Sequence, residues 1–141
     1  MDTKHIAGIT DLELFANCSK AELRQIGSLT TYLHVPRNTV LMREGSTAKE
    51  FLVIGSGTAR VSRETEAGVA TLADVGSGEF LGEMALLSGM RRTATATATS
   101  DLEVLVSSVG EFRSIMRIAP SVADKVVRTS MVRAASMDVA A

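Results

Sequence analysis

The stretch FLGEMALLSGMRRTATATAT, residues 80–99, combines features that ordinary core sequence does not need. Glu83 lies in an apolar run directly after Gly82, and the adjacent Arg91 and Arg92 follow shortly afterwards. The segment Glu83–Ser88 is rich in strong helix formers but is bounded by glycines, which predicts a helix of little more than one turn. The stretch therefore predicts a short helix with a carboxylate at its start and a guanidinium pair close by.

This arrangement of groups indicates a particular kind of ligand. A short helix that opens after a glycine presents N–H groups without intrahelical partners, and these favour an anion. An arginine adds a planar pair of donors that suits a phosphate. Glu83 would repel that anion unless ligand hydroxyl groups lie between the two. A cyclic phosphate fused to a ribose meets both demands, because its phosphate suits Arg92 and its 2′-hydroxyl suits the carboxylate.

The composition excludes several classes of protein. The chain has 141 residues, of which 45% are hydrophobic and 22% charged, and its net charge is −1. These values predict one globular domain over residues 1–141, without a basic face for nucleic acid. No apolar run is long enough to span a bilayer, so we expect a cytoplasmic protein without membrane contact. Arg outnumbers Lys and Ala is frequent, which favours a bacterial source with GC-rich DNA.

The N-terminal segment, residues 1–28, predicts two short helices. Thr10 with Glu13, and Ser19 with Glu22, both have the spacing of a capping box. Apolar residues at helical spacing give each helix one face for the core.

Residues 29–108 change to the short, regularly interrupted strands of a β-barrel. Leu29, Thr31, Leu33 and Val35 alternate with polar residues, which predicts a half-buried strand. Six further strands are predicted between glycine-rich turns: Val40–Arg43, Phe51–Ile54, Thr58–Arg63, Val69–Val75, Thr93–Thr99 and Leu102–Ser107. The pattern predicts a mainly β, α+β fold built on a jelly-roll barrel of about eight antiparallel strands.

Two helices are predicted over residues 109–137. Phe112, Ile115 and Met116 share one face of the first, which ends before Pro120. The second follows Pro120 and places five residues on its apolar side: Ala123, Val126, Val127, Met131 and Ala134. That side either seals the barrel or packs against a partner helix.

The sequence lacks the residue constellations of common enzymes. His5 and His34 are too few for a histidine metal site, and no serine lies in a G-x-S-x-G turn. Cys18 precedes a helix start, where an activated thiolate is conceivable, although a buried structural cysteine fits better. Without a nucleophile, base or metal cluster, we expect neither catalysis nor a metal.

The stretch at residues 80–95 resembles the phosphate-binding cassette of the cyclic nucleotide-binding domain family. That family includes the catabolite activator protein and regulatory subunits of cAMP-dependent kinase. The likeness extends to the L-F-x-x-C-S-x-x-E-L-x-x-I segment near the N-terminus, to Arg-Glu-Gly ending at Gly45, and to the F-L-V-I-G-S-G-T-A-R-V hairpin.

The resemblance implies a role for each matching residue. Gly82, Glu83 and Met84 would meet the sugar, with the Glu83 carboxylate on the ribose 2′-hydroxyl. Ala85, Arg92 and Thr93 would meet the cyclic phosphate, whereas Arg91 would be a solvated neighbour. The apolar residues near base and sugar would be Val61, Leu72 and Leu81, for which a plain core role is an equal alternative. The last helix would close over the base as a lid, with three candidate contacts: Arg133, Ala134 and Met137.

The resemblance leaves three questions open. Thr93 suits either the phosphate or the 2-amino group of guanine, and the bacterial composition favours cAMP over cGMP as the ligand. The output would be an unidentified protein effector, reached through movement of the last helix, and a homodimer is compatible with the pattern. The alternative is a degenerate member that serves as a protein-interaction scaffold without binding nucleotide. The intact Glu83 and Arg92 argue against that alternative, because a scaffold has no physical need for the pair.

Overall fold

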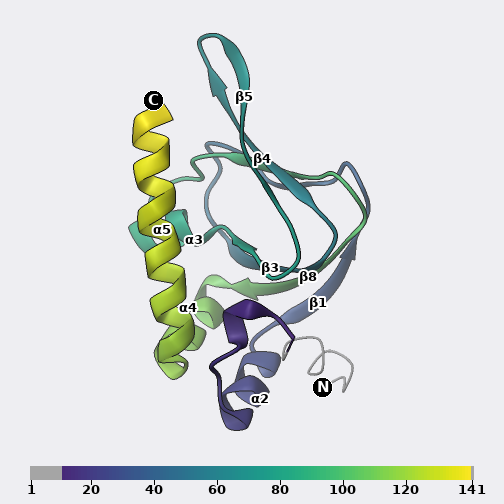
Figure 1. The fold of residues 1–141 in the computed structure, drawn as a ribbon, viewed down its shortest axis with the longest axis vertical. Coiled ribbons are helices and arrows are strands. Elements are labelled where there is room, and N and C mark those ends of the chain that lie inside the picture. The colour runs from purple at the N-terminus through teal and green to yellow at the C-terminus, as the bar shows by residue number, and fades with distance from the viewer. Residues whose placement is uncertain (1–10, 141) are drawn as a thin grey trace.

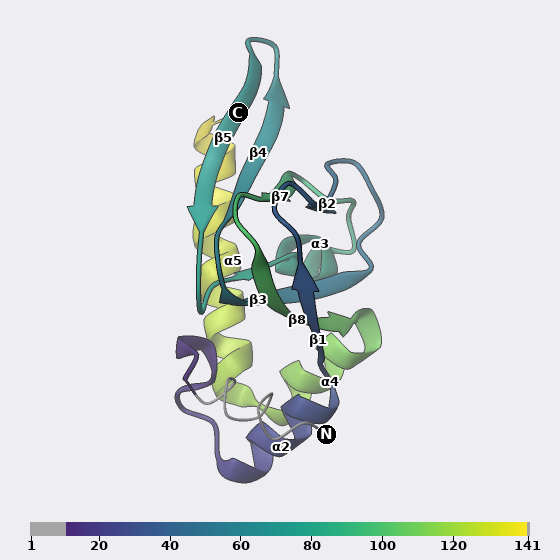
Figure 2. The ribbon, with the colours of Figure 1, turned by 90° about the vertical axis from the view of Figure 1, so that its right-hand side faces the viewer.

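Two four-stranded antiparallel sheets form the centre of the molecule. The computed structural model describes residues 11–140, with side chains described up to residue 136. Within this range the strand orders are β1-β8-β3-β6 and β2-β7-β4-β5. The strands are β1 (Thr31–Val35), β2 (Val40–Met42), β3 (Glu50–Ser56), β4 (Ala59–Thr65), β5 (Gly68–Val75), β6 (Phe80–Leu81), β7 (Thr95–Ala98) and β8 (Leu102–Ser108). The predicted jelly-roll barrel is confirmed, and the β4–β5 hairpin extends beyond the rest of it (Figures 1 and 2).

Helices cover one sheet and one side of this barrel. They are the 3-10 turn η1 (Glu13–Phe15), α2 (Lys20–Ser28), α3 (Glu83–Ser88), α4 (Val109–Ile118) and α5 (Pro120–Ala140). In Figure 1, η1, α2 and α4 gather below β8 and β3, while α5 runs along the side of the barrel. Its upper part packs against α3, the short helix of the opening sequence stretch. α5 thus connects the group formed by η1, α2 and α4 with α3.

The central strand β3 separates two hydrophobic cores. Phe51 and Val53 belong to the core between this sheet and the helices, which we call the helical core. In it the Phe51 ring lies 4.7 Å from that of Phe112. Leu52 and Ile54 belong to the core inside the barrel. Successive side chains of a strand point to opposite faces, so the continuous apolar run of β3 is explained by burial on both sides.

The small residues of β7 lie in the barrel interior. Ala96 and Ala98 are fully buried in the inner core, while Ala94 is half-buried just before the strand. The Thr residues between them lie on the opposite, partly exposed face. The Thr-Ala repeat is therefore a period-two strand pattern rather than a linker.

Two capping boxes fix helix starts near the core. Ser19 and Glu22 form the predicted box, in which Ser19 N–H donates to Glu22 Oε1 at 2.8 Å and Glu22 N–H to Ser19 Oγ at 3.1 Å. Ser108 and Glu111 form a second one at the start of α4, with the same two bonds at 2.9 and 3.2 Å. The sequence contains this second signal as well, and it marks the start of α4 at Val109.

The first predicted capping box is wrong. η1 begins after Leu12, which provides no side-chain cap, and it is a single 3-10 turn rather than an α-helix. Thr10, the predicted cap, lies outside the described residues. Leu14 and Phe15 are nevertheless buried in the helical core. The apolar pair is thus correctly assigned to the core, although the element around it is shorter than predicted.

The half-buried strand predicted from Leu29 is also wrong in its burial. β1 begins at Thr31 and lies at the edge of its sheet, next to β8 only. Both Tyr32 and Leu33 are exposed, by 44% and 46%, so the alternation does not separate a buried face from an exposed one. Period-two alternation shows that a strand has two different faces, but burial depends on what packs over each face.

The buried face of α5 agrees with the predicted one at Val126 but not at Val127 and Met131. Val122 and Val126 are fully buried, whereas Val127 and Met131 are exposed by 42% and 67%. Residues four apart lie on one face of a helix, so Val122 and Val126 define the face that meets the core.

Over the described residues, no helix has both the length and the apolar character needed to cross a membrane.

Candidate functional site

A left-handed glycine begins the short helix of the site. Gly82 has φ +95° and directly precedes α3, whose bounds are those predicted from the sequence. A Cβ at this position would lie 2.6 Å from Nη1 of Arg92 and 2.9 Å from the carbonyl oxygen of Glu50. Gly82 therefore serves two purposes: it allows the sharp turn from β6 into α3, and it leaves space for a guanidinium.

The guanidinium of Arg92 is buried and held by two backbone carbonyls. Its side chain is 4% exposed, and it donates from Nη1 to Gly82 O at 2.9 Å and from Nη2 to Glu50 O at 2.6 Å. The backbone of Arg92 is fixed as well, since it exchanges hydrogen bonds of 2.8 Å with Gly45 and Ser46. A guanidinium has five N–H donors, so this anchored group retains donors for an anion.

Electrostatics keeps this guanidinium charged. Burial lowers the pKa of Arg92, and the nearby carboxylates of Glu50 and Glu83 oppose that shift. Glu50 Oε1 lies 3.8 Å from Nη2. Arginine stays protonated in proteins even when it is buried, so the site holds a fixed positive charge. Arg91, by contrast, is exposed and donates to the carbonyl of Gly45 at 3.1 Å, as expected for a solvated neighbour.

The carboxylate of Glu83 is buried and only half paired. Its side chain is 1% exposed, and Oε1 accepts a hydrogen bond of 2.6 Å from Nη1 of Arg133. Among the described residues, Oε2 is buried without a hydrogen-bond partner. Burial raises the pKa of the Glu83 carboxyl, and the charge of Arg133 acts against this increase. A buried oxygen without a partner is costly, so a hydroxyl donor placed in the cavity would stabilise it.

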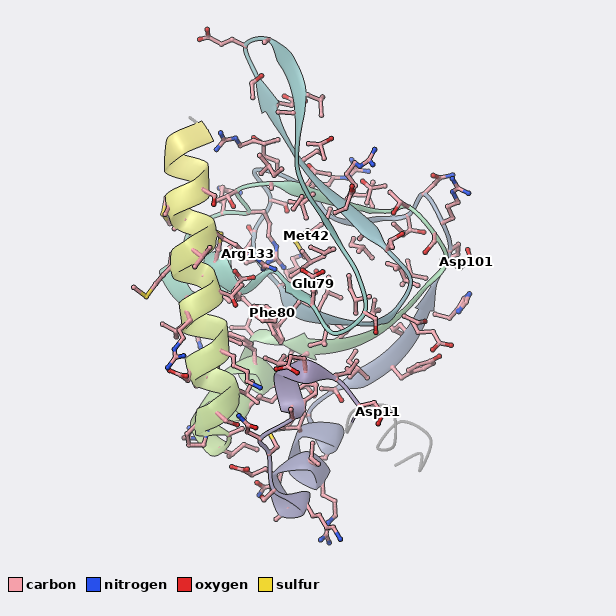
Figure 3. The ribbon with its side chains drawn as sticks, in the orientation of Figure 1. Asp11, Met42, Glu79, Phe80, Asp101 and Arg133 are labelled. Carbon is pink, nitrogen blue, oxygen red and sulfur yellow. The ribbon has the colours of Figure 1, made fainter. Side chains whose placement is uncertain are left out.

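Arg133 brings α5 into the site. Its guanidinium lies 5.0 Å from the ring centroid of Phe80, a cation–π contact, while it also pairs with Glu83. Phe80 is itself fixed in the helical core, with its ring 5.6 Å from that of Phe51. Figure 3 shows Arg133 extending from α5 toward Phe80 and the interior of the barrel. Through Arg133, α5 thus contacts the first residue of β6 and the first residue of α3.

These charged groups line a cavity of about 400 Å³, a size typical of small-molecule sites. Its walls come from β2, β4, β5, β6, α3, β7 and α5, and from the segments that join β5 to β6, β6 to α3 and α3 to β7. The lining residues are Met42, Val61, Thr71, Leu72, Ala73, Val75, Glu79, Leu81, Gly82, Glu83, Met84, Ala85, Arg92, Thr93, Ala94, Thr95, Ala96, Val132, Arg133 and Ser136. The cavity combines an apolar wall from the barrel with a fixed cation and a carboxylate.

Most residues singled out from the sequence line this one cavity. They are Val61, Leu72, Leu81, Gly82, Glu83, Met84, Ala85, Arg92, Thr93 and Arg133. Ala134 is half-buried on α5 and is not among the residues that line the cavity in the described part of the chain. Met137 lies outside the residues whose side chains are described. Of the three apolar candidates, Leu81 also belongs to the inner core and Val61 packs against it.

Several lining residues were not identified from the sequence. Thr71 and Ala73 lie two residues apart on β5, and Ala73 pairs with Val61 on the neighbouring strand β4. Strand pairing with Val61 is therefore a signal that could have identified this wall. Met42 gave no such signal, because its methyl group reaches the Gly82 turn from a strand far away in sequence.

Other chemistry is not assembled in the described residues. Within residues 11–136, whose side chains are described, no group of three or more His, Cys, Asp or Glu side chains could hold a metal ion. His34 is exposed on the edge strand β1, and His5 lies outside the described residues. Burial raises the pKa of the Cys18 thiol, which lies 3.8 Å from the Ser121 hydroxyl. A raised pKa disfavours the thiolate, which supports the structural interpretation of this cysteine over an activated one.

The chain is similar to several known proteins. The chain is 31% identical over 130 residues to Acetyltransferase Pat of Mycolicibacterium smegmatis, covering 92% of this chain and 39% of that protein. The solved structure of a cAMP-binding acyltransferase from Mycobacterium smegmatis matches with a TM-score of 0.75 and 29% identity, over 89% of this chain and 39% of that one.

The Thermus thermophilus catabolite activator protein has a TM-score of 0.78 and 28% identity, over 89% of this chain and 60% of that one. The chain thus spans less than two thirds of each of these relatives. The family model for the cyclic nucleotide-binding domain matches residues 32–118, which include both sheets, α3 and Arg92. The resemblance inferred from the cassette is confirmed: this chain belongs to the cyclic nucleotide-binding domain family.

Proposed function

We propose that this chain is a sensor module that binds a cyclic nucleotide, with cAMP favoured over cGMP, and regulates a protein partner through movement of α5. One observation carries the proposal: a buried guanidinium and a buried, half-paired carboxylate face the same cavity of about 400 Å³. A cyclic nucleotide supplies one anion, one hydroxyl donor and one apolar planar base, which match these three features of the cavity.

The contacts of Arg92 and Glu83 suggest how the ligand is oriented. Arg92 receives the cyclic phosphate, because its backbone anchors leave free N–H donors on a rigid group. Glu83 Oε2 accepts the ribose 2′-hydroxyl and so gains its missing partner. Gly82 and Met84 border the sugar, and Ala85 and Thr93 border the phosphate.

The base lies along the apolar wall in this arrangement. Val61, Leu72 and Leu81 line the cavity from β4, β5 and β6. An aromatic base gains favourable apolar contact there, roughly in proportion to the area removed from water. The preference for cAMP rests on the similarity to the mycobacterial structure, which is that of a cAMP-binding acyltransferase.

The output is a change in α5 that a partner reads. α5 contacts the cavity through Val132, Arg133 and Ser136, and it exposes Val127 and Met131 to solvent. Contiguous exposed apolar residues are typical of protein contact sites, so these residues suit an effector or a second copy of the chain. The chain acts in this proposal as a regulatory rather than a catalytic unit of a cytoplasmic protein.

Titration calorimetry on the purified chain with cAMP, cGMP and 5′-AMP tests the proposal. We expect cAMP to bind more tightly than cGMP, and 5′-AMP to bind weakly because its phosphate is not cyclised. If neither cyclic nucleotide produces heat or raises the melting temperature at millimolar concentration, the sensor function is wrong and the scaffold alternative replaces it.

A further inference from the structure

A second cavity, of about 330 Å³, lies beside the guanidinium of Arg92 on the side of β2 and the β2–β3 connection. Its lining residues are Val40, Leu41, Met42, Arg43, Ser46, Thr47, Lys49, Glu50 and Arg92. Of these, Met42 and Arg92 also line the first cavity, and the other seven do not. The two cavities therefore meet at Met42 and Arg92, and the proposed function assigns no ligand to the second one.

The floor of the second cavity is apolar. It is formed by Val40, Leu41 and Met42, the three half-buried residues of β2. Leu41 and Met42 pack against the inner core, and Met42 lies inside the barrel in Figure 3. An apolar group placed on this floor is removed from water, which favours its binding.

Charged side chains surround the floor. Three cations, Arg43, Lys49 and Arg92, line the cavity together with one carboxylate, that of Glu50. Glu50 Oε1 lies 3.8 Å from Nη2 of Arg92, so these two charges oppose each other. Arg43 and Lys49 are exposed, and in the part of the chain that the structure describes their side chains have no hydrogen bond or ion pair. Two positive charges are therefore left for a ligand.

The segment that carries these cations is held in place. The backbone N–H and the hydroxyl of Ser46 both donate to the carbonyl of Arg43, at 3.1 and 2.6 Å. The next anchor is the backbone of Arg92, which exchanges hydrogen bonds of 2.8 Å with Gly45 and Ser46. The turn at residues 43–46 is thus fixed against Arg92. A ligand that binds beside a fixed turn does not have to order it first.

We propose that the second cavity binds a small organic carboxylate with an apolar body, such as an aromatic or a short aliphatic acid. The carboxylate lies between Arg43 and Lys49, and the apolar body covers the floor formed by β2. Inorganic phosphate suits this cavity less well, because it has no apolar part for the floor. The site goes beyond the proposed function and does not depend on it.

An anion in the second cavity also weakens binding of an anion in the first. The carboxylate neutralises Arg43 and Lys49, whose charges otherwise add to the positive potential around Arg92. Two anions on either side of one guanidinium also repel each other. The coupling is reciprocal, so each ligand lowers the affinity for the other by the same factor. This coupling rests on the proposed function, because it requires the cyclic phosphate on Arg92.

A titration of the isotope-labelled chain with benzoate, followed by amide chemical shifts, tests the site. We expect saturable shifts at residues 40–50. Benzamide has the same ring without the charge, and it should bind at least about tenfold more weakly because it cannot form charge-assisted hydrogen bonds. Acetate has the charge without the ring, and it should also bind at least about tenfold more weakly because it buries little apolar area.

Two double variants of equal charge show which cations are used. Arg43→Gln with Lys49→Gln removes both free cations and should weaken benzoate at least about tenfold. The matched control is Lys20→Gln with Arg24→Gln, since both residues are exposed on α2 and line neither cavity. The control should bind benzoate within about twofold of the wild-type chain. If the first double variant does not fold, the two single variants decide, and each should show part of the loss.

Calorimetry with cAMP, with and without saturating benzoate, measures the coupling. Benzoate should weaken cAMP about fivefold in the wild-type chain, the lower end of typical coupling between sites. It should have no effect on cAMP in the double variant of Arg43 and Lys49. An unchanged cAMP affinity in the wild-type chain would overturn the coupling.

The remaining outcomes separate the site from the proposed function. Absence of saturable shifts, or shifts confined to the residues of the first cavity, would overturn the second site. Benzamide or acetate binding as tightly as benzoate would overturn the assigned class of ligand. If the wild-type chain bound benzoate at residues 40–50 but no cyclic nucleotide, the proposed function and the coupling would be wrong and the second site would stand.

Discussion

Arg92 and Gly82 are matched in space: Nη1 donates to the glycine carbonyl at 2.9 Å, and a Cβ on that glycine would lie 2.6 Å from the same nitrogen. The absence of a side chain at residue 82 is therefore what allows the guanidinium to reach its place. This relationship connects the turn before α3 with the cation of the cavity.

Gly82→Ala should lower both stability and nucleotide affinity. A left-handed conformation costs a non-glycine residue about 1–2 kcal/mol, and the added Cβ also displaces Arg92, for a total of about 3 kcal/mol. The matched control is Gly89→Ala, which has φ +73° but no atom within 4 Å of the added Cβ. It should cost about 1 kcal/mol of unfolding free energy and leave affinity unchanged. Denaturant unfolding and calorimetry measure both quantities, and equal affinities of the two variants would contradict the prediction.

Arg92 and its neighbour Arg91 should differ sharply when each is replaced by alanine. Arg92→Ala leaves the buried carbonyls of Gly82 and Glu50 without this donor, which costs about 2–4 kcal/mol of stability. It also removes the phosphate partner, so cAMP affinity should fall about 100-fold or more. Arg91→Ala removes an exposed bond and should change stability by no more than about 0.5 kcal/mol.

The variant Arg92→Lys separates the contribution of Arg92 to stability from its contribution to cAMP binding. It keeps the positive charge but cannot bond both carbonyls in the fixed planar geometry. We expect a smaller loss of stability than for alanine, with a persistent loss of cAMP affinity in calorimetry. If Arg91→Ala weakened cAMP more than Arg92→Lys, the assignment of the phosphate to Arg92 would be wrong.

Glu83 should make the stability of the ligand-free chain depend on pH. Burial raises its pKa in the folded state, while an unfolded glutamate titrates near about 4.3. Between these two pKa values the folded chain binds more protons than the unfolded chain, so stability falls as pH rises through that interval. The Glu83→Gln variant lacks this group. The stability of the wild-type chain minus that of Glu83→Gln should therefore decrease from pH 4 upward.

Denaturant unfolding at a series of pH values measures this difference. The charged groups that face Glu83 are Arg133 and Arg92, and both lower its pKa. Arg133→Gln removes the larger of these opposing charges, so it should steepen the decrease. A difference that increases with pH would show that ion pairing outweighs burial.

Replacement of Thr93 distinguishes two interpretations of base selectivity. It lines the cavity directly after Arg92. If its hydroxyl bonds the guanine 2-amino group, Thr93→Ala should weaken cGMP about fivefold, the value of one neutral hydrogen bond, and leave cAMP nearly unchanged. Thr97→Ala is the control, since Thr97 lies on β7 but not among the described lining residues. An equal loss for both nucleotides in calorimetry would instead assign the hydroxyl to the phosphate.

Local signals in the sequence predicted the elements that depend on neighbouring residues. The bounds of α3 follow from helix formers between two glycines, and the Ser19–Glu22 box follows from a spacing of three residues. These features need only contacts within a few residues, so the sequence contains all the information about them.

Predictions failed where burial depends on distant layers. Leu33 has the alternation of a half-buried strand, but it is 46% exposed on β1, the edge strand of its sheet. Val127 and Met131 have helical spacing, yet the core lies on the face of Val122 and Val126. Periodicity shows that a face exists, whereas packing decides which face is covered.

The sequence by itself determined the family, the cassette and its two key charges, Glu83 and Arg92, because residue type and spacing carry that information. Only the tertiary structure decided how these charges are held. The carbonyl of Glu50 anchors Arg92 from β3, and Arg133 reaches Glu83 from a helix fifty residues later in the chain. The physical reason is that hydrogen bonds between distant segments depend on how sheets and helices stack, and no local pattern encodes which oxygen a buried guanidinium will meet.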